Sequence, residues 1–355
     1  MSDTPRPTAK SGAVARPRVL SLALARSDAE PWWWSHFDRS SLPTDYHYAL
    51  VVDPEGRPRS MWSLRFWRMV GGITAALWRS RSNGDAFITT GECDWTSFVV
   101  AGWQTLTGMR RPRHVIVQFI MRERTASLAS RLKYVVMRWC FSSVDTVICS
   151  ARSECDYYEE AFGWPRGKAA YVPFHTDPSF LEVPTSEGDY AVAAGRTFRD
   201  YDTLLDAWAR VSSMPLVIVG YKGSRTPPPN VTVHRELPLA ELTRIIAGSR
   251  IVVVPLEERR ISIGQMVILQ GMAMGKPVVV TKVNGTVDYI EHMDTGLLVP
   301  PRDPAALASS VELLQADAAL RLRLSEAGRR RIRERHMMAH YITAVSRIMT
   351  TGARE

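Results

Sequence analysis

The stretch ISIGQMVILQGMAMGKPVVVT, Ile261 to Thr281, predicts a short loop, a helix and then a buried strand. Small and polar residues precede an apolar run that Gly275 and Pro277 end, and the Val-rich segment after them is typical of a strand in a parallel sheet. A helix that begins near Gly264 points unpaired backbone N–H groups and the positive end of its dipole at the loop before it. We therefore expect a diphosphate site at the start of this helix.

The length and composition predict two globular domains. The chain has 355 residues, of which 45% are hydrophobic, enough for two cores of ordinary size. No apolar run approaches the roughly 20 residues that cross a bilayer. The run Val19–Ala25 is at the short limit for the core of a signal peptide, about 7 to 15 residues. We interpret it as the first buried strand, behind an unstructured tail.

The cysteines indicate the cellular compartment, and the net charge indicates the kind of partner that the protein binds. The four cysteines lack the spacing of a metal site and are too few for a disulfide framework, so a reducing, cytoplasmic setting is the simplest account. The formal net charge of +9 favours acidic partners: nucleic acid, anionic lipid or phosphorylated small molecules.

Strand-like runs alternate with helix-length amphipathic segments along the chain. This order predicts an α/β fold with two parallel, doubly wound sheets, whose ligands bind beyond the carboxyl ends of the strands, in a cleft between the domains. The predicted strands are Val19–Ala25, Tyr48–Val52, Ala86–Thr90, Val115–Phe119 and Val144–Cys149, then Tyr190–Ala194, Leu216–Val219, Val231–His234, Ile251–Pro255 and Pro277–Thr281.

A change in composition marks the boundary between the two halves. Ten of the eleven tryptophans lie at or before Trp164, and Pro, Thr, Ser, Glu and Gly cluster from Leu181 to Asp189. We expect a disordered tail at 1–17, a Rossmann-like domain at 18–180, a linker at 181–189 and a second Rossmann-like domain at 190–335. A C-terminal helix at 336–355 then either stays with the second domain or crosses back to the first.

Several short motifs occur along the chain in a fixed order. Each motif alone is weak evidence of a protein family, but their shared order and spacing are specific. The motifs are Val144-Asp145-x-Val147-Ile148-x-Ser150, Val172-Pro173-Phe174-x-x-Asp177, Gly195-Arg196-x-x-Arg199-Asp200-Tyr201-x-Thr203-Leu204, Val254-Pro255-Leu256, Gly264-Gln265, LQGMAMGKPVVVT, Gly285-x-x-Asp288-Tyr289-Ile290-Glu291 and Asp294-Thr295-Gly296-Leu297-Leu298-Val299-Pro300-Pro301. On these motifs the chain resembles the family 4 retaining glycosyltransferases of the GT-B fold. The match is collinear across 188–335 and extends upstream over most of the chain.

The resemblance implies two GT-B domains, of which the first takes the acceptor and the second the donor. The donor would be a UDP- or GDP-sugar, and the acceptor a hydroxyl group of a glycan, a lipid-linked molecule or a small molecule. Transfer would retain the anomeric configuration, with the departing phosphate itself helping to deprotonate the acceptor, and it would need neither a metal nor a cofactor. Developing negative charge would be stabilised by arginine and by helix N–H groups.

Two positions depart from the family pattern, in which two glutamates eight residues apart contact the donor sugar and the ribose. Ser262 and Gln270 occupy these positions. The amide of Gln270 can still bond a ribose diol; the alternative is a polar residue on a partly wet helix face. Ser262 is too short to replace a carboxylate, and we expect it to cap the helix, which leaves Glu257 or Glu258 as the sugar contact.

Basic residues follow two of the predicted strands of the second domain. Arg196 and Arg199 come after Tyr190–Ala194, and Lys222 after Leu216–Val219. They could clamp the donor phosphates with charge-assisted hydrogen bonds, and the two arginines would then be catalytic. The alternative is an ordinary solvated face. The predicted donor site is completed by Glu258, Ser262, Gly264, Gln265, Met266 and Gln270.

In the first domain, polar residues follow two predicted strands. Gln118 and Glu123 are candidate catalytic residues, with Arg122 beside them, near where the family presents a polar group to the donor sugar. Glu92 and Asp94 occupy a similar strand end. A surface loop is the alternative for both pairs.

Three other motifs fail as functional sites. Asp200-Tyr201-Asp202 has a metal-binding form, yet we interpret it as the cap and first-turn acids of a helix. Gly271-x-x-x-Gly275-Lys276 has one residue too few for a phosphate loop, and Lys276 fits a helix C-terminus. His336 and His340 share a helix face without a third ligand, so no metal is expected.

The segment from Arg57 to Gly84 holds six arginines and no acids, interleaved with Trp62, Phe66, Trp67 and Trp78. The segment from Arg110 to Arg138 is also basic, with seven arginines and a lysine against one acid. One interpretation is a peripheral enzyme that acts at an anionic membrane surface, on its inner face. The other is a core-packed helix with a solvated arginine rim.

We therefore predict a metal-independent glycosyltransferase. The main alternative is a sugar-nucleotide-binding protein of the same fold without transferase activity, and an epimerase is a weaker one. Nucleic-acid binding is not expected, because no recognised module is present.

Overall fold

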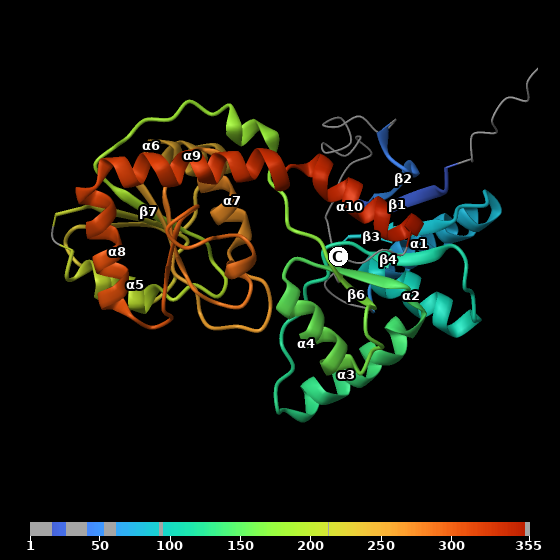
Figure 1. Ribbon diagram of the computed structural model, residues 1–355. Helices are drawn as coiled ribbons and strands as arrows, with labels where there is room; N and C mark the ends of the chain where they lie inside the picture. Colours follow the sequence, from blue (N-terminus) through green and yellow to red (C-terminus); the bar gives the residue numbers. More distant parts are fainter. Residues whose placement is uncertain (1–15, 26–40, 53–61, 92–94, 212, 352–355) are drawn as a thin grey trace, which may run out of the picture.

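The computed structural model describes residues 16–25, 41–52, 62–91, 95–211 and 213–351, which form two α/β domains side by side (Figure 1). Each domain contains a six-stranded sheet, in the order β2-β1-β3-β4-β5-β6 in the first and β12-β11-β10-β7-β8-β9 in the second. All pairings within the two sheets are parallel. The predicted pair of doubly wound sheets is confirmed.

The first domain places its helices around a sheet that begins near the N-terminus. The predicted strands are found with boundaries shifted by a few residues, and β6 was not predicted. The elements are β1 (Arg18–Ala25), β2 (Asp45–Val52), α1 (Leu64–Ser82), β3 (Phe87–Thr90), α2 (Trp95–Thr107), β4 (Arg113–Ile116), α3 (Leu128–Cys140), β5 (Thr146–Cys149), α4 (Arg152–Phe162) and β6 (Ala169–Tyr171).

The second domain follows the predicted order closely, with β12 as the one strand that was missed among the described residues. Its elements are β7 (Ala191–Ala194), α5 (Tyr201–Trp208), β8 (Leu216–Val219), β9 (Val231–His234), α6 (Leu239–Gly248), β10 (Ile251–Val254), α7 (Gln265–Ala273), β11 (Val278–Thr281), η5 (Thr286–Asp288), β12 (Leu297–Val299), α8 (Pro304–Ala316) and α9 (Ala318–Arg335).

Helix α7 begins where the sequence predicts, because Gly264 can adopt a left-handed backbone. Its φ is +87°, and a Cβ there would lie 3.0 Å from the Leu256 side chain. Farther along, Gly271 lets the helix lie close to β10 and β11, where a Cβ would be 3.2 Å from Val278 and 3.3 Å from Val252. The helix is therefore fixed in position by its fit to the sheet.

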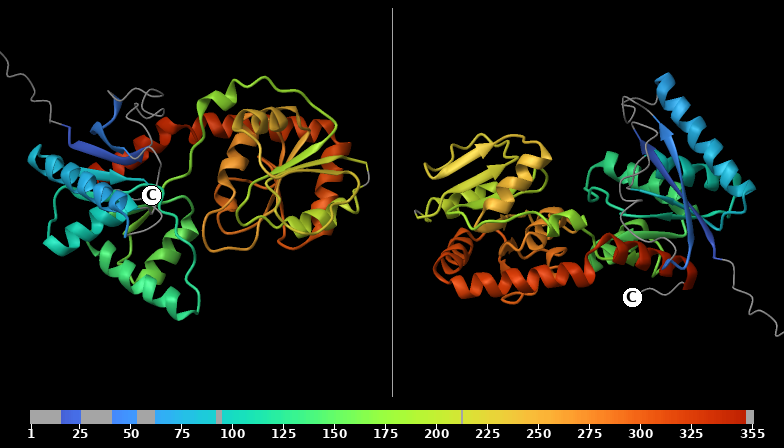
Figure 2. Two further views of the ribbon diagram at one scale, coloured as in Figure 1. Left: turned by 180° about the vertical axis from the view of Figure 1, so that it is seen from behind. Right: turned by 90° about the horizontal axis from the view of Figure 1, so that it is seen from above.

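The last helix, α10 (Met338–Thr351), packs on the first domain although α9 before it belongs to the second (Figures 1 and 2). Its Tyr341 and Val345 share a buried cluster with Val19 and Phe87 of the first sheet. The chain thus crosses between the domains a second time.

The basic, tryptophan-rich helix α1 was interpreted either as a helix at a membrane surface or as a core-packed helix, and it has features of both. Phe66 and Ile73 are buried against the sheet, as a core-packed helix requires. On its other face Trp67 is 62% exposed and Trp78 49% exposed. Residues 57–61 of this segment lie outside the described residues.

His336, at the junction of α9 and α10, lies between the two domains. The ring is 2% exposed, its Nδ1 lies 3.0 Å from the Phe174 carbonyl oxygen, and it packs on Tyr289. A carbonyl only accepts, so Nδ1 must carry the proton. Burial lowers the pKa of His336 from 6.5 to about 4.

We expect this histidine to make the protein acid-sensitive. Its folded pKa lies below the unfolded value, so its contribution to stability is complete above pH 6.5 and is lost as the pH falls toward about 4. His336→Gln should therefore show a smaller drop in melting temperature between pH 7 and pH 5 than the wild type. Parallel melting-temperature profiles for the two proteins would contradict this assignment.

Candidate functional site

An open pocket of about 290 Å³ lies beyond the ends of β7 and β8. These are neighbouring parallel strands, so the loops that follow them meet at one edge of the sheet. The loops bring together the predicted cations Arg196, Arg199 and Lys222, with Glu257 from the loop that leads into α7. These cations could bind phosphate groups, although the lining also holds three acids, Asp200, Asp202 and Glu257.

Arg199 is held in place by its own loop. Its Nε donates to the Ala194 carbonyl at 3.0 Å and its Nη1 to the Thr197 carbonyl at 3.0 Å. The guanidinium lies over Gly195, where a Cβ would come within 2.5 Å of it. Burial lowers the pKa of Arg199, although arginine stays charged at neutral pH. Nη2 has no hydrogen bond to any described residue, so it is available to a ligand.

Arg196 and Lys222 are freer. The Arg196 side chain is 58% exposed and its Nη1 pairs with Glu236 at 2.6 Å, an interaction worth at most about 1 kcal/mol at such exposure. A phosphate could replace this partner at small cost. Lys222 is exposed at the pocket rim. The solvated-face interpretation fits these two residues as well, whereas it does not fit Arg199.

The start of α7 contains a polar group without a partner. Gln265 is 7% exposed, and its Nε2 is buried without a hydrogen bond among the described residues. Buried polar groups normally have partners, so this amide is an exception at the start of the helix. Met266 beside it is 62% exposed. Gln270 is 8% exposed, which does not fit a wet helix face.

The expectation that Ser262 caps α7 is wrong. Gly264 occupies the N-cap position and no side chain bonds to the helix start there. The Ser262 hydroxyl instead donates to Glu154 Oε2 at 2.8 Å, and its N–H donates to Oε1 at 3.1 Å. Glu154 belongs to α4 of the first domain, so Ser262 is bound by a buried carboxylate of the other domain.

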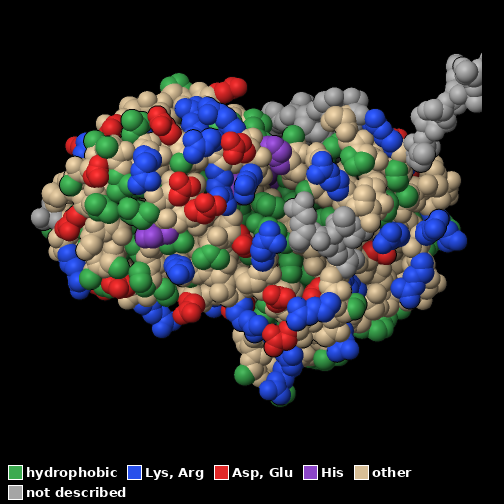
Figure 3. All heavy atoms as spheres, viewed as in Figure 1, with side chains coloured by type: hydrophobic (Ala, Val, Ile, Leu, Met, Phe, Trp, Pro, Cys, Tyr) green, Lys and Arg blue, Asp and Glu red, His purple; other side chains and the backbone are tan. Residues whose placement is uncertain are grey.

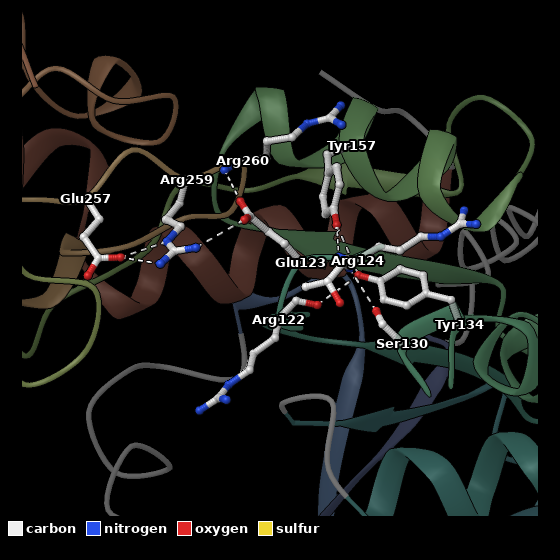
Figure 4. Close-up of polar contacts among 10 residues, drawn as sticks. Arg122, Glu123, Arg124, Ser130, Tyr134, Tyr157, Glu257, Arg259 and Arg260 are labelled. Atoms are coloured by element: carbon white, nitrogen blue, oxygen red, sulfur yellow. Dashed lines mark hydrogen bonds and ion pairs between the residues drawn. The ribbon is translucent and has the colours of Figure 1, made fainter. Parts of the chain in front are cut away.

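Glu123 bridges the domains rather than lining the pocket (Figure 4). It accepts a hydrogen bond from the Arg260 backbone N–H and lies 3.7 Å from the Arg259 guanidinium, which also pairs with Glu257. Its predicted catalytic role is not supported by this placement. Glu258 is exposed and does not line the pocket, whereas Glu257 does.

Gln118 takes a left-handed backbone conformation with φ +57°, which is uncommon outside glycine and is found at functional sites. Its Nε2 lies 3.2 Å from Nε2 of His175, whose pKa burial lowers to about 4, so this ring is neutral and accepts the hydrogen bond. Like Glu123, Gln118 does not line the pocket of Arg196 and Arg199. Arg122 is exposed, and Glu92 and Asp94 lie outside the described residues.

The motifs that the sequence analysis set aside have structural roles. Asp200 caps α5 by accepting from the Thr203 N–H at 3.0 Å, as expected. Lys276 is buried and donates to the Ser186 and Ser249 carbonyls. His340 accepts a hydrogen bond from the Met337 N–H. No group of three or more His, Cys, Asp or Glu residues in the described ranges could hold a metal ion.

Two residues that sequence reasoning missed join the domains at this site, Glu154 and Tyr289. Ser262, the partner of Glu154 in the second domain, lies 108 positions away, and the Tyr289 hydroxyl bonds to Ser150, 139 positions away. No spacing rule within one element could have found contacts of this range. The pairing of a lone acidic residue with a serine in another domain has no local sequence signal.

Part of the chain is similar in sequence to known glycosyltransferases. Residues 189–317, which include the pocket, match the family of glycosyl transferases group 1. The alpha-D-kanosaminyltransferase of Streptomyces kanamyceticus is 33% identical over 109 residues, or 31% of this chain and 27% of that protein. The chain thus spans about a quarter of the length of the curated relative it matches.

Solved structures show the same fold over nearly the whole chain. Sucrose-phosphate synthase from Thermosynechococcus elongatus has a TM-score of 0.66 at 18% identity, over 95% of this chain and 100% of that one. HepE of Anabaena, in complex with UDP-glucose, has a TM-score of 0.67 at 14% identity, over 94% and 100%. The fold is that of the GT-B glycosyltransferases.

We expect Arg199→Ala to weaken binding of a nucleoside diphosphate by about tenfold or more, since it removes the fixed guanidinium from the pocket. Arg199→Lys should recover only part of the affinity, because an ammonium lacks the planar fork. Isothermal titration calorimetry measures both, with the exposed Arg210→Ala at the end of α5 as the control. Unchanged affinity in Arg199→Ala would remove this residue from the site.

Proposed function

We propose that the protein is a glycosyltransferase of the family 4 type that moves a sugar from a nucleoside diphosphate to a hydroxyl acceptor. The observation that carries the proposal is the pocket of Arg196, Arg199 and Lys222, which adjoins the loop into α7. The Glu257 N–H bonds to the Phe198 carbonyl at 3.1 Å, so this loop and the arginine loop form one unit. The UDP-glucose complex of the similar HepE fold supports this type of donor.

The pocket can supply the main requirement of the chemistry. When the bond between the sugar C1 and the phosphate oxygen breaks, the electron pair stays on the diphosphate. Arg199, already oriented by its loop, would stabilise this charge without reorganising, and Arg196 would do so once the phosphate replaces its partner Glu236. Loss of one preorganised donor typically lowers the rate about 10²–10³-fold. The acceptor oxygen then bonds to C1, and its proton passes to the departing phosphate.

Two finer features belong to the same proposal. Retention of configuration follows if the acceptor approaches on the face that the diphosphate leaves, so that the phosphate oxygen receives the proton. Metal independence follows if arginine and helix N–H groups alone balance the diphosphate charge. The alternative is a sugar-nucleotide-binding protein without activity, which the serine at position 262 favours. Turnover in the presence of an acceptor separates the two.

We expect one of UDP, GDP, ADP, dTDP and CDP to raise the melting temperature without added magnesium. At about 100 times its dissociation constant, a nucleotide stabilises the protein by roughly 2.7 kcal/mol. Arg199→Ala serves as the control for binding elsewhere. The matching nucleotide sugar should then be consumed when a hydroxyl acceptor is added. Absence of any shift would contradict the proposal, and a shift without turnover across acceptors would favour the inactive binder.

The acceptor side has a surface suited to an anionic membrane, and we propose that the protein works at the inner face of one. Helix α3 buries Tyr134 and Met137, yet its opposite face is apolar as well. Basic residues flank this exposed face, including Arg131 and Arg138, and basic side chains occur at the lower tip of the first domain, where α3 and α4 lie (Figures 1 and 3). The exposed face consists of Leu128, Leu132, Val135, Val136 and Trp139, spaced i, i+4, i+7, i+8 and i+11.

An exposed apolar stripe with a basic border is typical of helices that lie in a membrane interface. The exposed Trp67 and Trp78 of α1 add a second such face, and α2 packs between the two helices. No described helix is long and apolar enough to span a bilayer. The proposal is thus surface attachment, which would bring a lipid-linked acceptor to the first domain.

We expect the protein to co-sediment with vesicles that contain phosphatidylglycerol, and at least about tenfold less with neutral phosphatidylcholine vesicles or in high salt. Leu132→Glu with Val136→Glu should abolish this binding, whereas Leu322→Glu, at an equally exposed position of α9, should not. Equal sedimentation of both variants would rule out α3 as the membrane contact. Self-association through α3, seen by sedimentation velocity, would assign the stripe to a second copy.

A further inference from the structure

Glu154 is a buried carboxylate that faces the other domain. It lies in the first turn of α4 and is 0% exposed. Its Oε1 accepts from the Ser262 N–H at 3.1 Å, and its Oε2 accepts from the Ser262 hydroxyl at 2.8 Å and from the Ser150 N–H at 3.2 Å. In the part of the chain that the structure describes, no lysine, arginine or histidine forms an ion pair with it.

Such a carboxylate is stable only if hydrogen-bond donors replace its water. Two of the three donors named above belong to Ser262 of the second domain. Burial raises the pKa of Glu154, in keeping with the lack of a cation nearby. The carboxylate is therefore satisfied in this buried position only while the two domains keep their present contact.

Two further hydrogen bonds join the start of α4 to the second domain. The Arg152 N–H donates to Asp288 Oδ2 at 2.9 Å, and the Tyr289 hydroxyl donates to the Ser150 carbonyl at 2.5 Å. Three contacts thus converge on one turn of one helix. We call this group the α4 latch: Ser150, Arg152 and Glu154 of the first domain with Ser262, Asp288 and Tyr289 of the second.

The latch acts on the loop that enters α7. Ser262 stands two residues before Gly264, the N-cap of that helix, and Glu257 at the start of the same loop lines the arginine pocket. We infer that Glu154 is a positioning residue, which through Ser262 holds the entry loop of α7 in register with the first domain. That this loop borders a donor site rests on the proposed function. The latch itself does not.

The test is an exchange of the two side chains. Ser262→Glu should place two carboxylates at hydrogen-bonding distance, which cannot both be ionised without a large cost. We expect faster amide hydrogen exchange across residues 257–264 and affinity for UDP that is about tenfold lower or more. The double variant Glu154→Ser with Ser262→Glu restores one hydroxyl and one carboxylate. It should recover exchange and affinity to within about threefold of the wild type.

Glu159→Gln is the matched control, because Glu159 is a buried carboxylate of the same helix that bonds only within its own domain, to the Gly167 and Ala169 N–H groups. It should lower the melting temperature without changing exchange in 257–264. The isosteric Glu154→Gln keeps one acceptor oxygen and should give an intermediate exchange rate, which provides a second measurement if the exchanged pair folds poorly.

Wild-type exchange in Ser262→Glu, or a double variant as impaired as Ser262→Glu alone, would overturn the latch. If the wild type binds none of the nucleoside diphosphates, the proposed function fails, and the exchange measurements still decide the latch. If nucleotide binding is normal but insensitive to these variants, the latch exists only as a structural contact and the positioning role is wrong.

Discussion

The close fit of α7 to its sheet is the constraint on which the candidate site depends. Gly271 brings the helix axis near Val252 and Val278, and the residues from Val267 to Ala273 are buried. A helix so enclosed cannot rotate or slide, so the direction of its first N–H groups is fixed. The left-handed Gly264 then turns the chain sharply into the loop that meets the arginine pocket. The tight packing of α7 therefore also fixes the direction of its dipole.

The fold could be read from the sequence because its signals are local. Short Val-rich runs between amphipathic segments allowed ten strands to be predicted. Strands β6 and β12 are only three residues long each, too short for a hydrophobic pattern to be recognised. The cations of the pocket were also predictable, since strand ends of a parallel sheet gather at one edge. The capping of α5 by Asp200 followed from a local preference.

The rest depends on long-range contacts. The relative orientation of the two domains decides whether Glu123 faces a ligand or the Arg260 backbone. The sequence of a single helix or strand does not determine that orientation. The same holds for Ser262. Its local sequence predicts a helix cap, whereas in the structure its hydroxyl bonds to the carboxylate of Glu154 in the other domain. The cap was expected at Ser262 from a local preference and is wrong, whereas the catalytic role of Glu123 stays a prediction.

The crossing of the chain between the domains has a mechanical consequence. The polypeptide passes from the first domain to the second after β6 and returns between α9 and α10. The two passages touch, because the Thr176 N–H donates to the His336 carbonyl at 2.8 Å. Because the two connections between the domains are held together at one point, the domains can move relative to each other mainly by rotation about that point. The α4 latch adjoins this point, because the Tyr289 hydroxyl accepts a hydrogen bond from the Phe174 N–H at 2.8 Å and its ring packs on His336. A rotation about this point would therefore also disturb the contacts of the latch.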